Sequence, residues 1–204
     1  DGEISTDEFN AVADKEVVAA LRLQEEAGVD IVSDGEQRRD NFYSYVVDKL
    51  HGMQLMKVSD LLDYAKDRAR LEEVLRALDV PAFAIKSPIV VNKLAKKNGL
   101  SLDEAAFVKE HCNLPLKVPI PGPYMLTRSA WFEGLSDKIY SSPEALAVDV
   151  VAILRDEVLA LKEMGVEFIQ FDEPILSQVV FGEESKETFM CAALPDRRDP
   201  TEEL

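Results

Sequence analysis

The stretch LKEMGVEFIQFDEP, residues 161–174, follows a pattern that is also found in LQEEAGVDIVSDGE, residues 23–36. Each stretch consists of a helix-like segment, a glycine, a short apolar run and then carboxylates. Gly28 and Gly165 suit the left-handed position that follows the C-terminus of a helix. Ligands bind at the C-terminal ends of parallel strands in α/β proteins, so the carboxylates that end the two runs predict a site there.

The composition limits the class of protein and its partners. With 204 residues, of which 47% are hydrophobic, the chain is long enough to bury a core of its own. Its formal net charge of -16 would repel nucleic acid and anionic membranes, so we expect neither as a partner. No apolar run approaches the ~18 residues that span a bilayer. The two cysteines, Cys112 and Cys191, are expected to be free thiols, which favours a cytoplasmic protein.

Hydrophobic periodicity predicts helices that alternate with short strands. Two helix starts, at Ser5 and Ser101, have capping-box spacing, in which a glutamate follows a serine after three residues. Prolines predict a stiff loop over residues 119–131, and the segment 35–53 is expected to be a loop that leads into helical or irregular structure. The helices are expected over residues 5–27, 59–78, 101–111 and 142–164, and the strands over residues 29–33, 82–91, 116–120 and 166–171.

Short strands that alternate with helices are typical of an α/β fold with a parallel sheet. We count roughly four βα units, whereas a closed (β/α)8 TIM barrel needs ~250 residues. Residues 1–204 are therefore expected to form a single domain that is part of a TIM barrel, or a smaller open sheet. The chain begins without methionine and ends in DPTEEL, which resembles the start of a helix, so we expect it to be truncated at both ends.

The carboxylates of the FDEP segment are the sharper of two candidate sites. Asp172 and Glu173 follow the apolar run of residues 166–171, and consecutive strand side chains point to opposite faces. One carboxylate is therefore expected to face the mouth of the sheet and the other to face outward. The alternative is a structural role, because acidic residues often cap the following helix.

The DGEQRR segment is the second candidate site. Asp34 and Glu36 can bind an ammonium group or a hydroxyl of a ligand, and Arg38 and Arg39 can bind a carboxylate through the guanidinium fork. Together these groups would suit an amino acid. The alternative is that the arginines pair with nearby acidic side chains on a solvated loop.

The proline-rich loop combines Gly122 with the flat side chains of Tyr124 and Trp131. This combination predicts either a shelf for a planar ligand or ordinary packing.

Patterns typical of metal sites are weak. His51 and His111 are the only histidines, and no Cys-x-x-Cys motif occurs. We therefore expect no metal ligands within this chain.

Three segments, DGEQRRDNF, VPIPGPYMLTRSAW and GVEFIQFDEP, resemble in this order the cobalamin-independent methionine synthase family, and in particular its shorter, single-barrel members. The resemblance implies a (β/α)8 barrel enzyme that transfers a methyl group to a thiol, usually that of homocysteine, to give methionine. It also implies a zinc ion that activates the thiol, because metal coordination keeps a thiol deprotonated at neutral pH. The implied partners are a small-molecule thiol and a methyl donor.

The resemblance assigns roles to individual residues. Glu36 matches the glutamate that holds the ammonium group of the amino acid. Asp172 matches the aspartate of the DEP motif that also lies on the amino acid, and Glu173 stands beside it. Lys86 falls in the segment that approaches the methyl donor. Arg38 and Trp131 complete the candidates for substrate binding.

The chain departs from the family pattern at three places. The zinc ligands of the family begin with a His-x-Cys pair on the strand after DEP, and none occurs before Leu204, so we expect them beyond that residue. The N-terminal Gly-Ser loop that contacts the amino acid backbone is also missing. Ser129 takes the position of a tryptophan that binds the folate ring, with Trp131 as a candidate substitute, so either a folate-type or a corrinoid donor fits the sequence.

Two alternatives fit the same residues. A related thiol alkyltransferase, of the type that joins coenzyme M to epoxides, would keep the fold and the thiol activation but change the electrophile. A catalytically inactive binding domain would keep only the fold. This segment by itself is expected to be inactive in methyl transfer.

Overall fold

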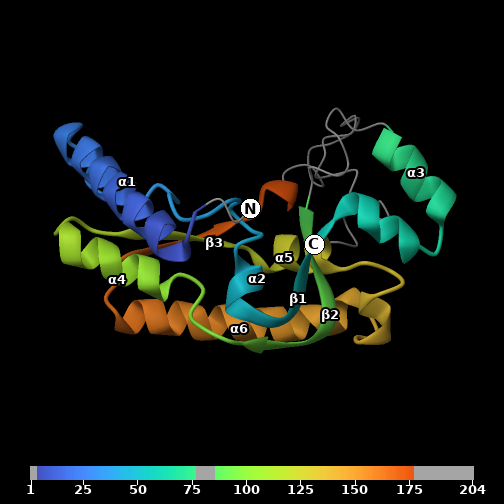
Figure 1. Cartoon of the computed structure of the whole chain (residues 1–204). Helices are drawn as coiled ribbons and strands as arrows, with labels where there is room; N and C mark the ends of the chain where they lie inside the picture. Colours follow the sequence, from blue (N-terminus) through green and yellow to red (C-terminus); the bar gives the residue numbers. More distant parts are fainter. Residues whose placement is uncertain (1–3, 77–85, 177–204) are drawn as a thin grey trace.

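The computed structural model describes residues 4–76 and 86–176. These residues form an α/β structure that contains two two-stranded sheets (Figure 1). The parallel sheet pairs β3 (Lys117–Pro121) with β4 (Phe168–Asp172). The antiparallel sheet pairs β1 (Leu50–Lys57) with β2 (Lys86–Lys96). None of the helices in residues 4–76 and 86–176 combines the length and the hydropathy of a membrane span.

The helices surround one main core. In Figure 1, α6 runs along the bottom of the view, and α1 and α4 lie at its left. The core joins the inner faces of these three helices to both sheets, and Val17, Val108, Ile120 and Leu161 are among its buried members. The helices are α1 (Thr6–Glu26), α2 (Val46–Lys49), α3 (Arg68–Arg76), α4 (Leu102–His111), α5 (Pro123–Ala130) and α6 (Pro143–Glu163), with 3₁₀ helices η1 (Val58–Asp63) and η2 (Ser136–Lys138).

The ends of the two longest helices follow the sequence prediction. The Ser5 hydroxyl accepts a hydrogen bond from the Glu8 N–H at 3.2 Å, and the Glu8 carboxylate accepts one from the Ser5 N–H at 2.8 Å, which completes the capping box of α1. Ser142 caps α6 in the same way at the N–H of Ala145. Gly28, just beyond α1, has a φ of 74°.

The strand predicted over residues 29–33 is wrong except at one residue. Val32 is fully buried and forms an isolated parallel bridge to Leu116. The N–H and the carbonyl of Ser33 are instead bonded to the side chain of Gln24, at 3.0 and 2.9 Å. A helix side chain therefore occupies the backbone groups that a longer ladder would need.

The antiparallel sheet corrects two predictions. The segment 35–53, predicted as a loop that leads into helical or irregular structure, contains the helix α2 but also the first four residues of β1, which the prediction missed. The strand predicted over residues 82–91 begins at Lys86 and continues to Lys96 (residues 82–85 lie outside the described residues). Its partner is β1 rather than a parallel neighbour, so the expected βα repeat is interrupted here. Pairing with a strand distant in the sequence determines these bounds, and local periodicity does not report such pairing.

The helix predicted over residues 59–78 is divided into η1 and α3. The Tyr64 N–H bonds to the Leu61 carbonyl and ends η1, and the Asp67 carboxylate then accepts the N–H of Arg70 at 3.0 Å and begins α3. An aspartate inside an amphipathic run can thus start a new helix, because its side chain competes for backbone donors. Residues 77 and 78 lie outside the described residues.

The loop predicted over residues 119–131 is mostly a helix. Pro119 and Pro121 lie in β3, and α5 begins at Pro123, where a proline suits the first helical position. The prediction treated the prolines as stiffening a loop and overlooked this role.

Gly52 is predicted to be essential for the antiparallel sheet. It has a φ of 90° at the irregularity between His51 and Met53, and a Cβ there would lie 2.4 Å from the Lys93 carbonyl oxygen. We expect Gly52→Ala to lower the free energy of unfolding, measured by urea denaturation, by about 3 kcal/mol. Gly28→Ala is the matched control, because Gly28 also has a positive φ but nothing lies within 4 Å of a Cβ there; its expected cost is about 1 kcal/mol. Equal losses in the two variants would contradict the steric argument.

Candidate functional site

The candidate site lies where the strands of the parallel sheet end. Pro121 ends β3 and Asp172 ends β4, and these two residues are opposite each other in the register. Val32 bonds to the other edge of β3 and leads directly into the segment that carries Asp34 and Glu36. The carboxylates of the two repeated sequence patterns therefore follow the ends of two segments that flank β3 on either side.

Glu36 has an unusual backbone conformation. Its φ of 55° makes it the one non-glycine residue with a positive φ in the described part of the chain. The Asp34 carboxylate accepts the Glu36 N–H at 3.0 Å, and the Glu36 carbonyl accepts the Arg39 N–H at 3.0 Å. A glutamate in this region is strained, and strain of this kind is concentrated at functional sites.

Several charged groups, Asp172 among them, act on the Glu36 carboxylate. Burial raises the pKa of Glu36, and the nearby Arg39 guanidinium partly offsets that effect. The negative charges of Asp172 and Asp34 raise the pKa of Glu36 further, and the positive charge of Lys117 lowers it. The fold has thus gathered one partly buried glutamate and the Asp172 carboxylate at the same end of the sheet.

Glu173 has a different environment from its neighbour. Its two carboxylate oxygens accept the N–H groups of Tyr124 and Met125, each at 2.8 Å, at the start of α5. Burial raises the pKa of Glu173, and these two backbone donors act in the opposite direction. A Cβ on Gly122 would lie 2.1 Å from a Glu173 oxygen, so only glycine permits this approach. Glu173 thus satisfies free backbone donors of a helix.

Arg39 connects the loop that carries Glu36 to the rest of the domain. Its guanidinium bonds to the Glu104 carboxylate at 2.6 and 3.1 Å, to the Ser101 hydroxyl at 3.1 Å and to the Pro119 carbonyl at 3.0 Å. It also lies over the Tyr45 ring, 4.1 Å from the centroid. The side chains of Arg39 and Glu104 are only 2% and 7% exposed. The sequence motif drew attention to Arg39, but the family resemblance did not place it among the site candidates.

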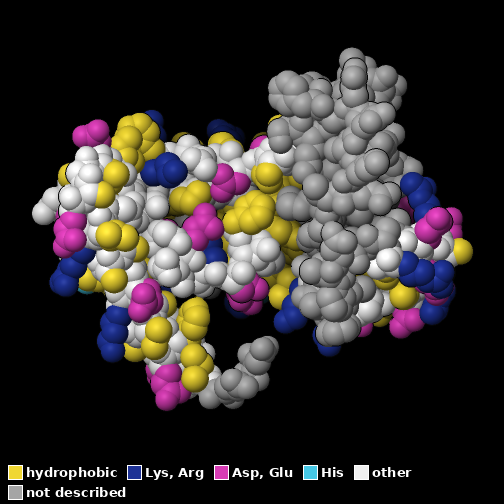
Figure 2. All heavy atoms as spheres, turned by 90° about the horizontal axis from the view of Figure 1, so that it is seen from above, with side chains coloured by type: hydrophobic (Ala, Val, Ile, Leu, Met, Phe, Trp, Pro, Cys, Tyr) yellow, Lys and Arg dark blue, Asp and Glu magenta, His cyan; other side chains and the backbone are white. Residues whose placement is uncertain are grey.

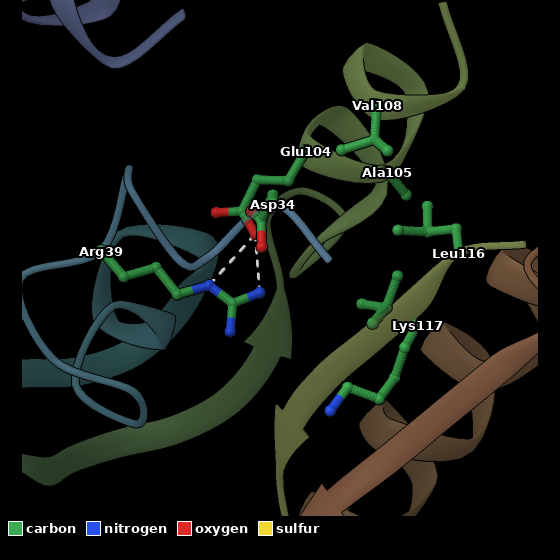
Figure 3. Close-up of a pocket in the computed structure, with 8 residues that line it drawn as sticks. Asp34, Arg39, Glu104, Ala105, Val108, Leu116 and Lys117 are labelled. Atoms are coloured by element: carbon green, nitrogen blue, oxygen red, sulfur yellow. Dashed lines mark hydrogen bonds and ion pairs between the residues drawn. The ribbon is translucent and has the colours of Figure 1, made fainter. Parts of the chain in front are cut away.

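A small pocket lies beside this ion pair. Figure 3 shows Asp34 close to Glu104, with Arg39 bonded to Glu104 and Lys117 at the opposite side of the pocket. One oxygen of the buried Asp34 carboxylate has no hydrogen-bond partner among the described residues. The cavity volume of about 10 Å³ is near the minimum that admits a single water molecule, so this pocket does not hold an amino acid.

The other three candidates have different environments. Arg38 pairs with Asp14 of α1 and lies over the Phe107 ring of α4, at 4.6 Å from the centroid. Trp131 is buried in the main core. Lys86 is exposed at the first position of β2. The charges of Glu36 and Asp172 interact at the same end of the sheet, and the roles of all the candidate residues stay predictions.

The described residues do not fit a zinc site. Nowhere in residues 4–76 and 86–176 are three or more His, Cys, Asp or Glu side chains grouped so that they could hold a metal ion. Cys112 is a free, buried thiol that donates to Glu25 at 3.2 Å, and burial raises its pKa. Cys191 lies outside the described residues. The expectation that the zinc ligands follow Leu204 stays a prediction.

The site is defined by local geometry rather than by overall charge. Figure 2 shows acidic side chains spread over the face seen from above rather than gathered in one patch. Carboxylates at the C-terminal ends of parallel strands occupy the position at which α/β proteins commonly bind ligands.

The chain belongs to the family described as cobalamin-independent synthase, catalytic domain, whose model matches residues 1–195. This match confirms the resemblance seen in the sequence motifs. The chain is 33% identical over 176 residues to a methionine synthase of Thermococcus kodakarensis, and this alignment covers 86% of the chain and 46% of the relative. It is 30% identical over 178 residues to a 5-methyltetrahydropteroyltriglutamate--homocysteine methyltransferase of Buchnera aphidicola, with 87% and 21% covered.

One solved structure has a similar fold. It is that of a B12-independent methionine synthase from Shewanella sp. W3-18-1 in complex with selenomethionine. The TM-score is 0.64 at 26% identity, and the match covers 88% of this chain and 46% of that one. The chain therefore spans less than half the length of these three relatives.

Arg39 is predicted to contribute strongly to stability. Arg39→Met leaves the buried Glu104 carboxylate uncompensated, and breaking a buried pair in this way costs about 3–5 kcal/mol. Arg38→Met is the matched control, because Arg38 pairs with an aspartate whose side chain is 45% exposed, and such pairs contribute about 0–1 kcal/mol. Urea denaturation of both variants measures the difference. A loss for Arg39→Met as small as that of the control would show that the pair is not a structural anchor.

Proposed function

We propose that the protein transfers a methyl group to the thiol of homocysteine to give methionine, and that Glu36 and Asp172 bind the ammonium group of the amino acid. The observation that carries the proposal is the placement of the two carboxylates at the C-terminal edge of the parallel sheet: Asp172 ends β4, Glu36 follows the Val32 bridge to the strand segment before β3, and their charges interact. Two acidic groups around one cation form charge-assisted hydrogen bonds, which are among the stronger polar contacts. The names of the relatives and the selenomethionine in the Shewanella structure support an amino acid ligand.

Asp172 and Glu173 are proposed to have separate roles. Both oxygens of Glu173 are used by the backbone of α5, whereas Asp172 is bonded to the side chain of exposed Gln170. This division agrees with the alternation of strand side chains, and it favours Asp172 as the residue that contacts the ligand.

The methyl donor is proposed to be of the folate type. The Buchnera relative is named for 5-methyltetrahydropteroyltriglutamate, and the family is named for its independence from cobalamin. Ser129, which takes the position of the folate-binding tryptophan, donates its hydroxyl to the Met125 carbonyl at 2.7 Å within α5. Because residues 4–76 and 86–176 do not fit a zinc site, none of their side chains is assigned a part in thiol activation.

We also propose that residues 1–204 form part of a single (β/α)8 barrel. The parallel pair β3 and β4, connected through α5 and α6, is the unit from which such barrels are built. Phe168 and Phe171, on β4, are 46% and 47% exposed, so this strand has apolar surface that further barrel elements would cover. A cytoplasmic location and the absence of nucleic acid and membrane partners stay predictions.

Glu36→Gln and Asp172→Asn are each expected to weaken homocysteine binding by about tenfold or more, because each removes a charged partner of the ammonium group. Isothermal titration calorimetry on the complete gene product measures this effect. Asp103→Asn is the control, because the Asp103 side chain is 67% exposed and pairs with Lys49. We expect this variant to bind homocysteine with unchanged affinity. Glu173→Gln should mainly lower the melting temperature, since it removes a carboxylate that holds the start of α5. Unchanged affinity in both site variants would refute the assignment.

The affinity for homocysteine is also expected to depend on pH. Glu36 must be ionised to bind an ammonium group, and its pKa lies above the ordinary value of 4.5, so binding should weaken as the pH falls through this raised pKa. The negative charge of Asp172 contributes to that rise, so Asp172→Asn should move the midpoint to lower pH. Titration of the dissociation constant between pH 4 and 8, roughly the range that brackets a raised carboxyl pKa, tests both statements. A midpoint that moves upward in this variant would contradict the proposed proximity of the two carboxylates.

A further inference from the structure

A line of three polar side chains runs across the parallel sheet towards the candidate site. Lys117 begins β3, Gln170 lies within β4 and Asp172 ends β4. In the register, Lys117 is opposite Phe168 and Gln170 is opposite Pro119. Because strand side chains alternate and register partners share a face, the three side chains lie on the same face of the sheet.

Hydrogen bonds join these side chains in one direction. The Lys117 ammonium donates to the Gln170 side-chain oxygen at 3.2 Å, and the Gln170 amide nitrogen donates to the Asp172 carboxylate at 2.6 Å. A lysine only donates and an ionised carboxylate only accepts, so the residue between them must do both. The amide of glutamine meets this requirement, and its orientation is determined by its two neighbours.

These three side chains are not members of the main core. The hydrogen bonds that join the three side chains lie at exposed positions, whereas Val118, at the alternate position of β3, is buried in the main core. Exposed polar pairs contribute little to folding free energy. The two hydrogen bonds in series leave the Asp172 carboxylate with a fixed donor on one oxygen.

We infer that Lys117 and Gln170 are positioning residues that hold the Asp172 carboxylate in place for the ammonium group of the substrate. The inference rests on the proposed function, and it adds two residues to which no role has been assigned. Restricting a carboxylate before the ligand arrives reduces the conformational entropy that binding must remove.

Lys117 has a second effect on the same site. The groups that act on the Glu36 carboxylate are Arg39 and Lys117, which are positive, and Asp34 and Asp172, which are negative. Lys117 lowers the pKa of Glu36 and so favours its ionised form. The same positive charge also repels a bound ammonium group. If Lys117 acts by orienting Asp172, its removal should weaken binding, whereas if it acts by its charge alone, its removal should tighten binding.

The test measures homocysteine binding by calorimetry in the complete gene product. Gln170→Leu keeps the size of the side chain but removes both hydrogen bonds, and we expect a loss of affinity of about fivefold. Lys117→Met should also weaken binding, by about threefold, whereas a lysine that acted only through its charge would give tighter binding when removed. Lys117→Arg keeps a donor and should restore the affinity to within about twofold.

A double-mutant cycle tests whether Lys117 acts through Gln170. In the Gln170→Leu background, Lys117→Met should cause no further loss of affinity, because the connection to Asp172 is already absent. If the losses of affinity in the two single variants instead add up in the double variant, the inference is overturned. The controls are Lys15→Met on α1 and Gln54→Leu on β1, both away from the parallel sheet, and neither should change the affinity.

A measurement without ligand separates this inference from the proposed function. Crystal structures of the unliganded Gln170→Leu and Lys117→Met proteins should show the Asp172 carboxylate rotated away from its wild-type position or in several conformers. If the Asp172 carboxylate keeps its wild-type position in both variants, the inference is overturned regardless of how homocysteine binding changes. If the wild-type protein fails to bind homocysteine while Asp172 moves in these variants, the proposed function fails and the positioning role stands.

Discussion

The buried ion pair between Arg39 and Glu104 is the interaction on which the arrangement of the site depends. One guanidinium bonds to the first turn of α4 and to the backbone of β3, and it lies over the ring of Tyr45. Three segments that are distant in the sequence are thereby held by a single side chain. A charge buried this deeply is tolerated only when its donors are satisfied, so the three segments must keep their relative positions.

The strained backbone of Glu36 follows from this constraint. The Arg39 N–H and the Asp34 carboxylate bond to either side of Glu36 and hold it at a positive φ. Because Arg39 is itself fixed by the core, the loop cannot relax without breaking the buried ion pair. The chain thus maintains a partly buried glutamate whose carboxylate interacts with the charge of Asp172, and the proposed binding of an ammonium group depends on this arrangement.

The two adjacent carboxylates at the end of β4 show how one sequence motif can serve two purposes. Glu173 organises the start of α5, and Asp172 is connected through Gln170 and Lys117 along one face of the sheet. The alternation of strand side chains separates these roles, since neighbouring residues cannot share a face. The carboxylate proposed to bind the ligand is therefore adjacent in the sequence to the residue that holds the start of α5.

The sequence by itself determined the features that depend on local chemistry: the capping box at Ser5, the proline-led start of α6, the two parallel strands and the family to which the chain belongs. It misjudged Ser101 and Glu104, which have capping-box spacing, yet the Ser101 hydroxyl and the Glu104 carboxylate both bond to Arg39. It also missed β1, whose partner is a distant strand. Only the tertiary structure decided these points. Sequence spacing indicates which hydrogen-bond partners are local, but the fold can bring a distant partner closer, and a side chain then bonds to that one instead.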